Sequence, residues 1–307
     1  MDCVFFGTPD FAVSSLKALI HAENYHVKAV FTQPDKKVGR KQLLTFPPVK
    51  EAALQYGISV FQPERIKEEK WLNVLRELNP DIIVTAAFGQ ILSKELLEIP
   101  KKGVINVHGS LLPKYRGPAP IQWAIINGEK VTGITTMFTN EGIDTGDILL
   151  KRELEIKEDE TAGELFERLS TLGAEVLLET LDNLESITPI KQNESEASYF
   201  PMLQKDIAEI DFCKTAQEVN NLVRGLNPWP VAFFNLDDLK IKVVCAKVID
   251  DLNGKPGEVL KWNAKDGIVI ACGKGAIQVL KLQAAGKKIM DSASFANGKK
   301  IEVGTVL

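Results

Sequence analysis

The sequence predicts an α/β protein with a Rossmann-like, mostly parallel sheet domain followed by a small OB-fold-like β-barrel domain. The first half of the 307-residue chain alternates short apolar runs with amphipathic helical patterns, which is typical of a parallel sheet covered on both faces. The last third carries short strand-like runs separated by glycines, which favours a small β-barrel. We therefore expect a first domain at 1–189, a linker at 190–205 and a second domain at 206–307.

The elements of the first domain follow from the positions of its apolar residues. Strands are expected where apolar runs are compact, and helices where apolar residues recur every three or four positions. The expected strands are Asp2–Phe6, Val27–Thr32, Ile82–Ala86 and Val104–Val107, and the expected helices are Phe11–Ile20, Pro48–Tyr56 and Glu69–Leu78. A further helix should have Pro118 at its first helical position and run to about Ile126, because proline suits that position.

The chain changes character after residue 130. Two strands are expected on either side of a turn-rich segment at 141–146, followed by a long amphipathic helix at Ala162–Leu184. The polar stretch Thr188–Ser198 has few apolar residues and marks the beginning of the predicted linker. The second domain should contain a helix at Ala216–Arg224 and strands near 231–236, 239–248, 257–262, 267–272, 275–283 and 300–306.

Composition and charge narrow the class of protein. Hydrophobic residues make up 45% and charged residues 25%, and no apolar run is long enough to span a membrane, as in a soluble globular protein. The start lacks the basic residues of a secretory signal, and the four cysteines are widely separated, so we expect a cytoplasmic protein without a disulfide framework. The net charge is −4, yet residues 205–307 carry 15 Lys and Arg against 12 Asp and Glu. This asymmetry is a modest hint of a polyanionic partner, and an ordinary solvated surface explains it equally well.

Two polar residues interrupt the predicted strand near residue 105. Asn106 and His108 lie two positions apart, so their side chains share one face of the strand. Gly109 and Ser110 follow and end the strand, which places the pair near the carboxyl end of a parallel strand, where open α/β sheets bind ligands. A structural pair with satisfied hydrogen bonds is the alternative, because an unpaired buried polar group costs about 1–3 kcal/mol.

Asp144 is the candidate third member of this site. It lies in the turn Gly142-Ile-Asp144-Thr-Gly146, where the backbone can approach a ligand closely. An aspartate between glycines is more often a turn residue with local hydrogen bonds. The upstream Asn106 and His108 are what favour a functional role for it.

The segment NVHGSLLPKYRGPAPIQWAIINGE, followed by GIDTGDILL, resembles the signature of the folate-dependent formyltransferases. The resemblance covers essentially the whole chain. The opening FFGTPDFAVSSLKAL and the later LNPWPVAFF are most similar to the members that act on initiator methionyl-tRNA. Small departures from the family pattern occur at Ser93, Pro118 and Val231, and they leave the geometry of the folate pocket and linker open.

The resemblance implies an activity and a set of site residues. Asn106, His108 and Asp144 would form the catalytic trio, and 10-formyltetrahydrofolate would be the cosubstrate that donates the formyl group, with no metal. The amide of Asn106 and the imidazole of His108 would stabilise the tetrahedral oxyanion, while Asp144 holds His108 and accepts the amine proton through water. Folate-binding residues are expected in two segments that resemble the family's folate pocket, namely Ser110, Leu111, Leu112 and Pro113 in one and Phe88 and Gln90 in the other.

A basic loop follows the second predicted strand and falls where the tRNA-acting members carry a tRNA-contacting insertion. Its cations are Lys36, Lys37, Arg40 and Lys41. We expect these residues to contact the acceptor end of initiator methionyl-tRNA, with Arg40 as the principal contact because a guanidinium suits phosphates and stacked bases. The basic second domain would follow phosphates elsewhere on the tRNA. The alternative is an ordinary solvated loop.

Other functions remain to be weighed against formyl transfer to methionyl-tRNA. Formyl transfer to a small amine, such as a sugar nucleotide, keeps the trio and the folate segments but leaves the basic loop and second domain unexplained. A nicotinamide-dependent oxidoreductase is disfavoured because Gly7-Thr-Pro-Asp-Phe-Ala lacks the GxGxxG pattern. A non-catalytic RNA-binding protein is disfavoured because the trio is intact. Since the second domain is part of the same chain, we expect a monomer, without a membrane partner.

Overall fold

The computed structural model describes residues 1–39 and 42–307, and the chain folds into two compact units. The first unit comprises Met1–Pro120, Val131–Glu155 and Phe166–Pro201, and the second comprises Ile121–Lys130, Ile156–Leu165 and Met202–Leu307. None of the helices within the described ranges is long and apolar enough to cross a membrane.

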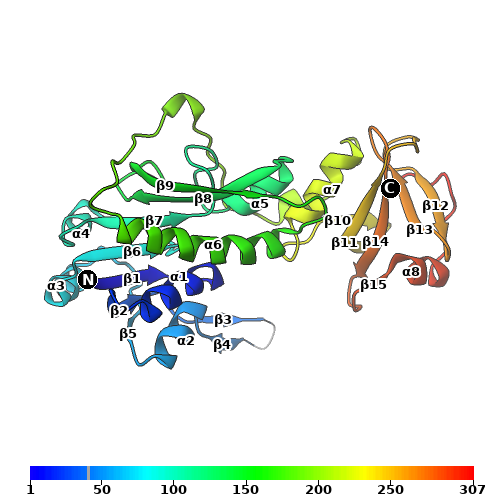
Figure 1. Cartoon of the computed structure of the whole chain (residues 1–307). Helices are drawn as coiled ribbons and strands as arrows, with labels where there is room; N and C mark the ends of the chain where they lie inside the picture. The colour runs from blue at the N-terminus through cyan, green and yellow to red at the C-terminus, as the bar shows by residue number, and fades with distance from the viewer. Residues whose placement is uncertain (40–41) are drawn as a thin grey trace. The chain divides into compact units, whose positions relative to one another are not determined.

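A seven-stranded sheet forms the centre of the first unit (Figure 1). Its strands lie in the order β5 (Ser59–Phe61), β2 (His26–Phe31), β1 (Asp2–Gly7), β6 (Ile82–Ala86), β7 (Val104–His108), β8 (Val131–Phe138) and β9 (Ile148–Glu155). The first five run parallel, and β8 is antiparallel to both β7 and β9. The prediction of a Rossmann-like, mostly parallel sheet is therefore confirmed.

Helices cover both faces of this sheet. On one face α1 (Asp10–His21) packs beside α6 (Ala162–Asp182), and the hydroxyl of Ser170 donates to the carbonyl of Phe11 at 3.0 Å. On the other face, α3 (Glu69–Leu78) and α4 (Lys94–Leu97) pack on a buried cluster that includes Phe6 and Phe31. Strands with two covered faces explain why the sequence of β1 and β6 is apolar at nearly every position.

Two further predicted helices are α2 in the first unit and α5, which belongs to the second unit from Ile121 onward. Residues Pro48–Gln55 form α2, which begins at the predicted proline. Helix α5 spans Pro120–Ile126, so the prediction that Pro118 takes the first helical position is wrong. The amide of Gly117 is instead bonded to the carboxylate of Asp144, which keeps the chain in a loop until Pro120 begins the helix.

The strand order reverses at the centre of the sheet. From β1 the chain passes first to β2 on one side and later to β6 and β7 on the other. The carboxyl ends of β1, β6 and β7 are thereby neighbours at one edge of the sheet, which is where open α/β folds bind ligands.

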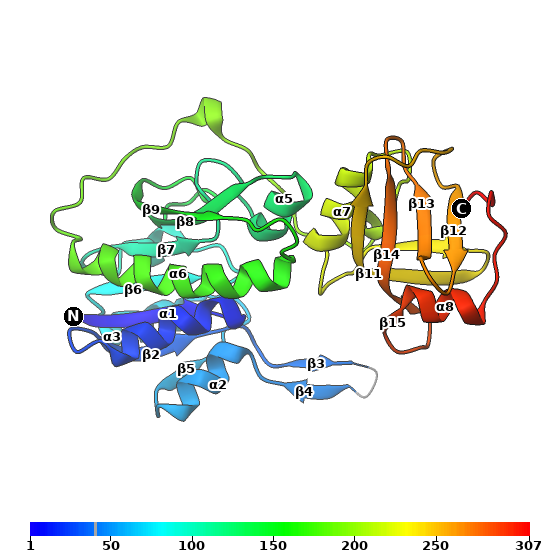
Figure 2. The same ribbon diagram turned by 45° about the vertical axis from the view of Figure 1, so that its right-hand side comes forward.

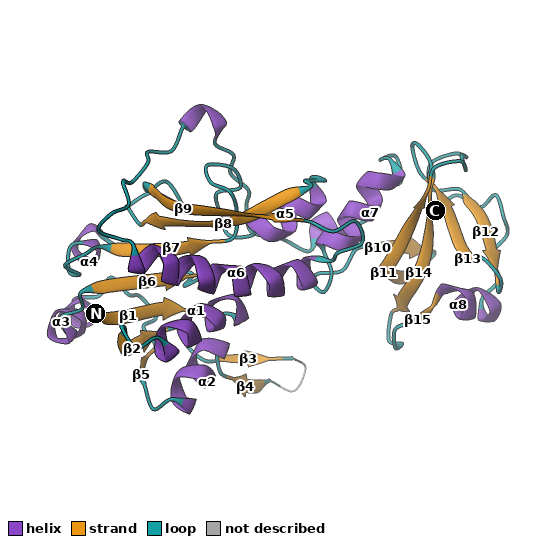
Figure 3. Cartoon of the chain, in the orientation of Figure 1, coloured by secondary structure: helices purple, strands orange, loops and turns teal. Residues whose placement is uncertain are grey.

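The second unit contains an antiparallel sheet (Figure 3). Its path is β10 (Phe233–Leu236), β11 (Leu239–Ile249), β14 (Ala276–Ala284), β13 (Gly267–Ala271) and β12 (Val259–Asn263), with β15 (Met290–Asp291) paired to β14. Helix α7 (Ala216–Gly225) begins at a capping box of Thr215 and Glu218. The predicted small β-barrel domain is confirmed as an antiparallel sheet curled into a half-barrel, and its closer assignment to the OB-fold stays a prediction.

Some elements differ from the sequence prediction. The segment expected as a strand near 300–306 does not form a continuous strand. Gly304 and Thr305 exchange backbone hydrogen bonds with Val259, and Val306 makes an isolated bridge to Glu258. The structure instead has helix α8 at Ser292–Gly298, which packs on β12, β13 and β14. Two short 3-10 helices, η1 (Glu194–Glu196) and η2 (Asp206–Ala208), were not expected.

The predicted basic loop contains a hairpin. Strands β3 (Lys36–Val38) and β4 (Leu43–Thr45) pair antiparallel and form a small sheet of their own (Figure 2). At the root of the hairpin, Lys50 of α2 donates to both carboxylate oxygens of Asp35 at 2.8 and 2.7 Å, and this pairing holds the pKa of Asp35 below its usual value. Lys50 also lies 4.0 Å from the ring centroid of Phe46, so one cation contacts the chain at both ends of the hairpin.

Candidate active site

Strand β7 places Asn106 and His108 at its carboxyl end. Asn106 lies opposite Thr85 of β6, and the hydroxyl of Thr85 donates to Asn106 Oδ1 at 2.8 Å. This bond directs the other end of the amide, Nδ2, away from Thr85. The side chain of Asn106 is partly exposed, so a hydrogen-bond donor is held in place next to a buried partner.

His108 is buried, with 6% of its surface exposed, and its ring is held from one side. Its Nε2 lies 2.9 Å from the carbonyl oxygen of Tyr115. Because a carbonyl only accepts, Nε2 carries the hydrogen of this bond. The loop after β7 turns back sharply to bring that carbonyl to the ring, and Tyr115 has a left-handed φ of 60°. The second ring nitrogen, Nδ1, faces away from this contact.

Asp144 reaches the same place from the loop between β8 and β9. Its Oδ1 lies 3.7 Å from His108 Nδ1, which is too long for a direct hydrogen bond, and its Oδ2 accepts from the Gly117 amide at 2.8 Å. The loop needs glycine at Gly146, because a Cβ there would lie 1.6 Å from the carbonyl oxygen of Phe138. Asp144 itself has a left-handed φ of 54°, an uncommon conformation that its surroundings must maintain.

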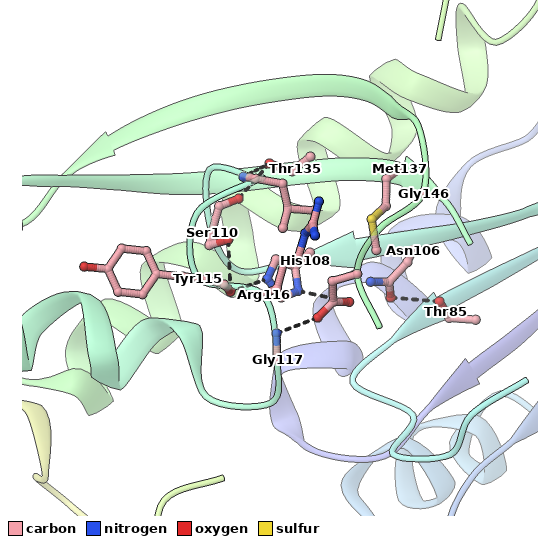
Figure 4. A network of polar contacts seen from close by, with 12 residues as sticks. Thr85, Asn106, His108, Ser110, Tyr115, Arg116, Gly117, Thr135, Met137 and Gly146 are labelled. Atoms are coloured by element: carbon pink, nitrogen blue, oxygen red, sulfur yellow. Dashed lines mark hydrogen bonds and ion pairs between the residues drawn. The ribbon is translucent and has the colours of Figure 1, made fainter. Parts of the chain in front are cut away.

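The structure thus brings the three predicted residues together. Figure 4 shows Asn106 and His108 on β7, and the dashed lines from His108 and from Gly117 end on the same carboxylate, that of Asp144. The side chains of His108 and Asp144 are 7% and 17% exposed. The cluster is therefore largely shielded from solvent, and Asp144 is the more accessible of the two to a ligand. An amide donor, an imidazole nitrogen and a carboxylate can together stabilise an oxyanion and accept a proton.

Sequence reasoning did not assign a role to Arg116 or Gln192, which lie next to the trio. The Arg116 side chain is 8% exposed and pairs with Glu194, and its guanidinium also donates to Gln192 Oε1. The hydrogen bond to Glu194 raises the pKa of Arg116 above its usual value and lowers that of Glu194. Gln192 and Glu194 lie 76 and 78 residues after Arg116 in the sequence, so their contacts with it could not be predicted. The arginine next to the Asn106–His108 motif was the one sequence signal of this cluster.

The loop after β7 contains the first predicted folate segment. Ser110 is fully buried, and its hydroxyl donates to the carbonyl of Lys114 at 2.7 Å. Leu112 is fully buried in a small cluster with Met137 and Ile148, and the peptide bond to Pro113 is cis. Leu111 is partly exposed, and it is the leucine of the segment that a ligand can reach.

The second predicted folate segment follows β6. Phe88 is buried in the core beside Phe6, and its carbonyl accepts from Thr8 Oγ1 at 3.0 Å. The side-chain amide of Gln90 accepts from the amide of Ile66 and donates to the carbonyl of Pro63. Both side chains are therefore engaged within the protein, and the segment presents mainly its backbone at the edge of the sheet.

The predicted tRNA-contacting cations lie on and next to the β3–β4 hairpin. Lys36 and Lys37 are exposed on β3, whereas Arg40 and Lys41 lie outside the described residues. Beside the two lysines, Leu43 and Leu44 are 64% and 62% exposed. Among the described residues, no cluster of three or more His, Cys, Asp or Glu side chains has the arrangement of a metal site.

Comparison with known proteins identifies the relatives of this chain. The family model described as formyl transferase matches residues 1–181, and the model described as formyl transferase, C-terminal domain, matches residues 202–300. The methionyl-tRNA formyltransferase of Acetivibrio thermocellus is 51% identical, with 100% of this chain and 99% of the relative aligned. That of Clostridium perfringens strain 13 is 50% identical, with both chains fully covered.

Solved structures share the fold at lower identity. The N-formyltransferase from Helicobacter canadensis, in complex with folinic acid and dTDP-3-aminofucose, has a TM-score of 0.68 at 22% identity and aligns over 91% of this chain and 98% of that one. A methionyl-tRNA formyltransferase from Clostridium thermocellum has a TM-score of 0.59 at 21% identity, over 82% of this chain and 95% of the other. With both family models matched in order and relatives aligned end to end, this chain belongs to the formyl transferase family.

Proposed function

We propose that the protein transfers the formyl group of 10-formyltetrahydrofolate to the α-amino group of initiator methionyl-tRNA, giving N-formylmethionyl-tRNA for translation initiation. The proposal rests on one observation above all, the meeting of Asn106, His108 and Asp144 at the carboxyl end of β7. Relatives named methionyl-tRNA formyltransferase align with the full chain at about half identity and support the choice of substrate.

The reaction needs charge stabilisation more than a strong base. A free α-amino group has a pKa of about 7.7–8.0, and an adjacent ester lowers it, so much of the amine is neutral near pH 7. Its nitrogen attacks the formyl carbon, and the carbonyl oxygen becomes an oxyanion. The bond from carbon to folate N10 then breaks, one proton leaves the amine, and one proton reaches N10.

The site residues have matching roles. Asn106 donates from Nδ2 to the oxyanion, because Thr85 holds the other end of its amide. His108 donates from Nδ1 in its imidazolium form, in which both ring nitrogens carry a hydrogen, since the Nε2 hydrogen is committed to the Tyr115 carbonyl. One donor of this kind is worth about 2.7–4 kcal/mol in the transition state. Asp144 Oδ1 lies 3.7 Å from Nδ1, close enough to stabilise the charged imidazole electrostatically, and Asp144 accepts the amine proton through a water molecule.

The folate would lie along the edge of the sheet between the two loops. Leu111 contacts the pterin from the loop after β7, and Ser110, Leu112 and Pro113 set the shape of that loop. The segment that contains Phe88 and Gln90 contributes backbone groups, because both side chains are engaged within the protein. In this arrangement the folate is a cosubstrate, and the proposed steps use no metal.

The tRNA would be held by exposed cations. Lys36 and Lys37 on β3, with Arg40 and Lys41, contact the acceptor end, and the exposed lysines of residues 206–307 contact phosphates elsewhere. We propose a catalytic domain at 1–189, a linker at 190–205 and a tRNA-binding domain at 206–307. We also propose that the protein acts in the cytoplasm as a monomer, because both substrate-binding parts belong to one chain.

A label-transfer assay tests the function. Purified protein is incubated with formyl-labelled 10-formyltetrahydrofolate and either methionine-charged initiator tRNA or a dTDP-aminosugar, and the label is followed into each acceptor. We expect efficient transfer to the charged tRNA and little to the sugar. Preferential transfer to the aminosugar would favour the small-amine alternative, and transfer to neither would refute formyl transfer to either acceptor.

A further inference from the structure

The segment after α6 contacts two parts of the first unit, the loop that follows β7 and the region around the Asp144 loop between β8 and β9. Ile190 exchanges backbone hydrogen bonds with Ile148 at the start of β9. Further along, the backbone of Arg116 donates to the carbonyl of Ser198 at 2.8 Å and accepts from the amide of Phe200 at 2.9 Å. Residues 190–200 are therefore bonded at one end to the first residue of β9 and at the other end to the loop that follows β7.

Between these ties, Gln192 bonds to the backbone of the Asp144 loop. Its Nε2 donates to the carbonyl of Asp144 at 2.8 Å and to the carbonyl of Gly146 at 2.8 Å. Its Oε1 accepts from Arg116 Nε at 3.1 Å and Nη2 at 2.8 Å. Because a guanidinium only donates and carbonyls only accept, one orientation of the amide satisfies all four contacts.

Arg116 fixes the position of Gln192 in turn. Its side chain is 8% exposed and donates to both oxygens of Glu194, at 2.9 and 2.8 Å. A guanidinium whose nitrogens are bonded to two partners, one of them bidentate, has little freedom to move. The contacts thus form a chain from Glu194 through Arg116 and Gln192 to the carbonyl of Asp144.

The Asp144 backbone needs such support. Its φ of 54° is a left-handed conformation that costs an aspartate free energy, and the carboxylate direction toward His108 depends on it. Gln192 bonds the carbonyl of this residue and the carbonyl two residues later, so it holds the loop on both sides of the turn.

We propose that Gln192 is the positioning residue for Asp144 in the reaction. Through two backbone carbonyls it keeps the carboxylate facing His108 Nδ1 and the Gly117 amide. The expected effect on kcat rests on the proposed function. The expected effect on the position of the Asp144 carboxylate does not depend on which acceptor the protein uses.

The decisive variant is Gln192→Glu. A glutamate keeps the size and the contact with Arg116 but cannot donate to the two carbonyls, and its second oxygen would repel them. We expect kcat for formyl transfer to fall about 10- to 100-fold, from the loss of two hydrogen bonds, with the KM for both substrates nearly unchanged. Gln55→Glu, the same substitution at an exposed position of α2, is the matched control and should behave as wild type.

A double-variant cycle separates positioning from general stability. If Gln192 acts through the Asp144 carboxylate, then Gln192→Glu should cause little further loss of kcat in an Asp144→Asn background. A full multiplicative loss in that background would overturn the proposal, as would a wild-type kcat in the single variant. The melting temperature of each variant shows that the protein compared is folded.

Hydrogen exchange gives a readout that does not need activity. The Gly117 amide donates to Asp144 Oδ2 at 2.8 Å, so displacing the carboxylate exposes that amide. We expect exchange at Gly117 to accelerate at least about tenfold in Gln192→Glu and to stay unchanged in Gln55→Glu. Unchanged protection of the Gly117 amide in Gln192→Glu would overturn the positioning role, whether or not the wild type is active. An inactive wild type in the transfer assay would refute only the proposed function.

Discussion

The end of β7 and the β3–β4 hairpin hold their polar groups in opposite ways. At β7, His108 and Asp144 are largely buried, and each is oriented by a backbone group of the loop at 115–117. On the hairpin, Lys36 and Lys37 are exposed, and so are Leu43 and Leu44 on the paired strand. At the root of the hairpin, the chain is held by the ion pair of Lys50 and Asp35.

This difference in exposure and orientation suits two different tasks, namely transition-state stabilisation at β7 and polyanion binding on the hairpin. Stabilising a charge that exists only in a transition state requires donors that are already in place, because reorganisation at that moment raises the barrier. Binding a large polyanion requires cations that can reach phosphates, and its strength comes from displaced counterions more than from exact geometry. Substitutions should therefore affect kcat at β7 and tRNA affinity on the hairpin.

The largest effect is expected for Asp144→Asn. Asparagine tolerates the left-handed φ and can still accept from Gly117, so folding should be preserved while the charge facing His108 is lost. We expect kcat to fall about 1,000-fold, within the usual range for a proton-transfer group. Steady-state kinetics with charged tRNA measure this, and Asp147→Asn in the same loop is the control. A kcat close to wild type would end the role of Asp144.

Asn106→Asp should have the next largest effect. The aspartate keeps the bond from Thr85 but replaces the Nδ2 donor with a negatively charged oxygen, which repels the oxyanion. We expect a loss of kcat of at least about 100-fold with a smaller change in KM. The exposed Asn24 offers a matched Asn→Asp control. If KM rose while kcat held, Asn106 would bind substrate in its ground state and would not be an oxyanion donor.

The residues at β7 could be predicted from sequence because their relation is local. This holds for Asn106 and His108, which lie on one strand where a two-residue spacing fixes a shared face. Asp144 lies on a separate loop, and it was predicted from the upstream pair and the resemblance to the formyltransferases, because its turn alone favours a structural role. Gln192 could not be predicted, because its partners at 116, 144 and 146 meet it only in the folded chain. Its segment is polar and was therefore interpreted as linker.

The hairpin and α8 were missed for a different reason. Strands β3 and β4 have three residues each and no buried face at β4, so they carry no alternating pattern to detect. Helix α8 is seven residues long and ends in glycine, with Ser292 and Ala296 as its buried positions. The apolar residues at 300–306 suggested a strand, but the segment pairs with β12 only through backbone bonds of Gly304 and Thr305 to Val259 and the isolated bridge at Val306.

On the hairpin, a double charge reversal tests the other half of the comparison. Lys36→Glu with Lys37→Glu should weaken binding of charged tRNA about tenfold at moderate salt and lower the dependence of log Kd on log salt by about 1–2. Filter binding across a salt series measures both. Reversing the exposed Lys17 and Lys67 instead makes the same change in net charge and should have little effect. Equal losses in the two double variants would mean that net charge alone attracts tRNA and that the hairpin has no special role.

The smallest effect is expected for the ion pair of Arg116 and Glu194, which supports the Asp144 loop through Gln192. The Arg116 guanidinium lowers the pKa of Glu194 below its usual value of 4.5, so the pair stabilises the fold above that pH and loses its contribution as pH falls through the lower folded-state pKa. Glu194→Gln should therefore reduce the urea midpoint slightly at pH 7, and the difference from wild type should shrink toward zero as the pH falls below the lowered pKa of Glu194. The exposed side of Glu194 keeps this effect small, since solvent screens the pair. A difference that grew at acid pH would have the wrong sign for a carboxylate with a lowered pKa and would mean that Glu194 supports Arg116 as a neutral hydrogen-bond partner.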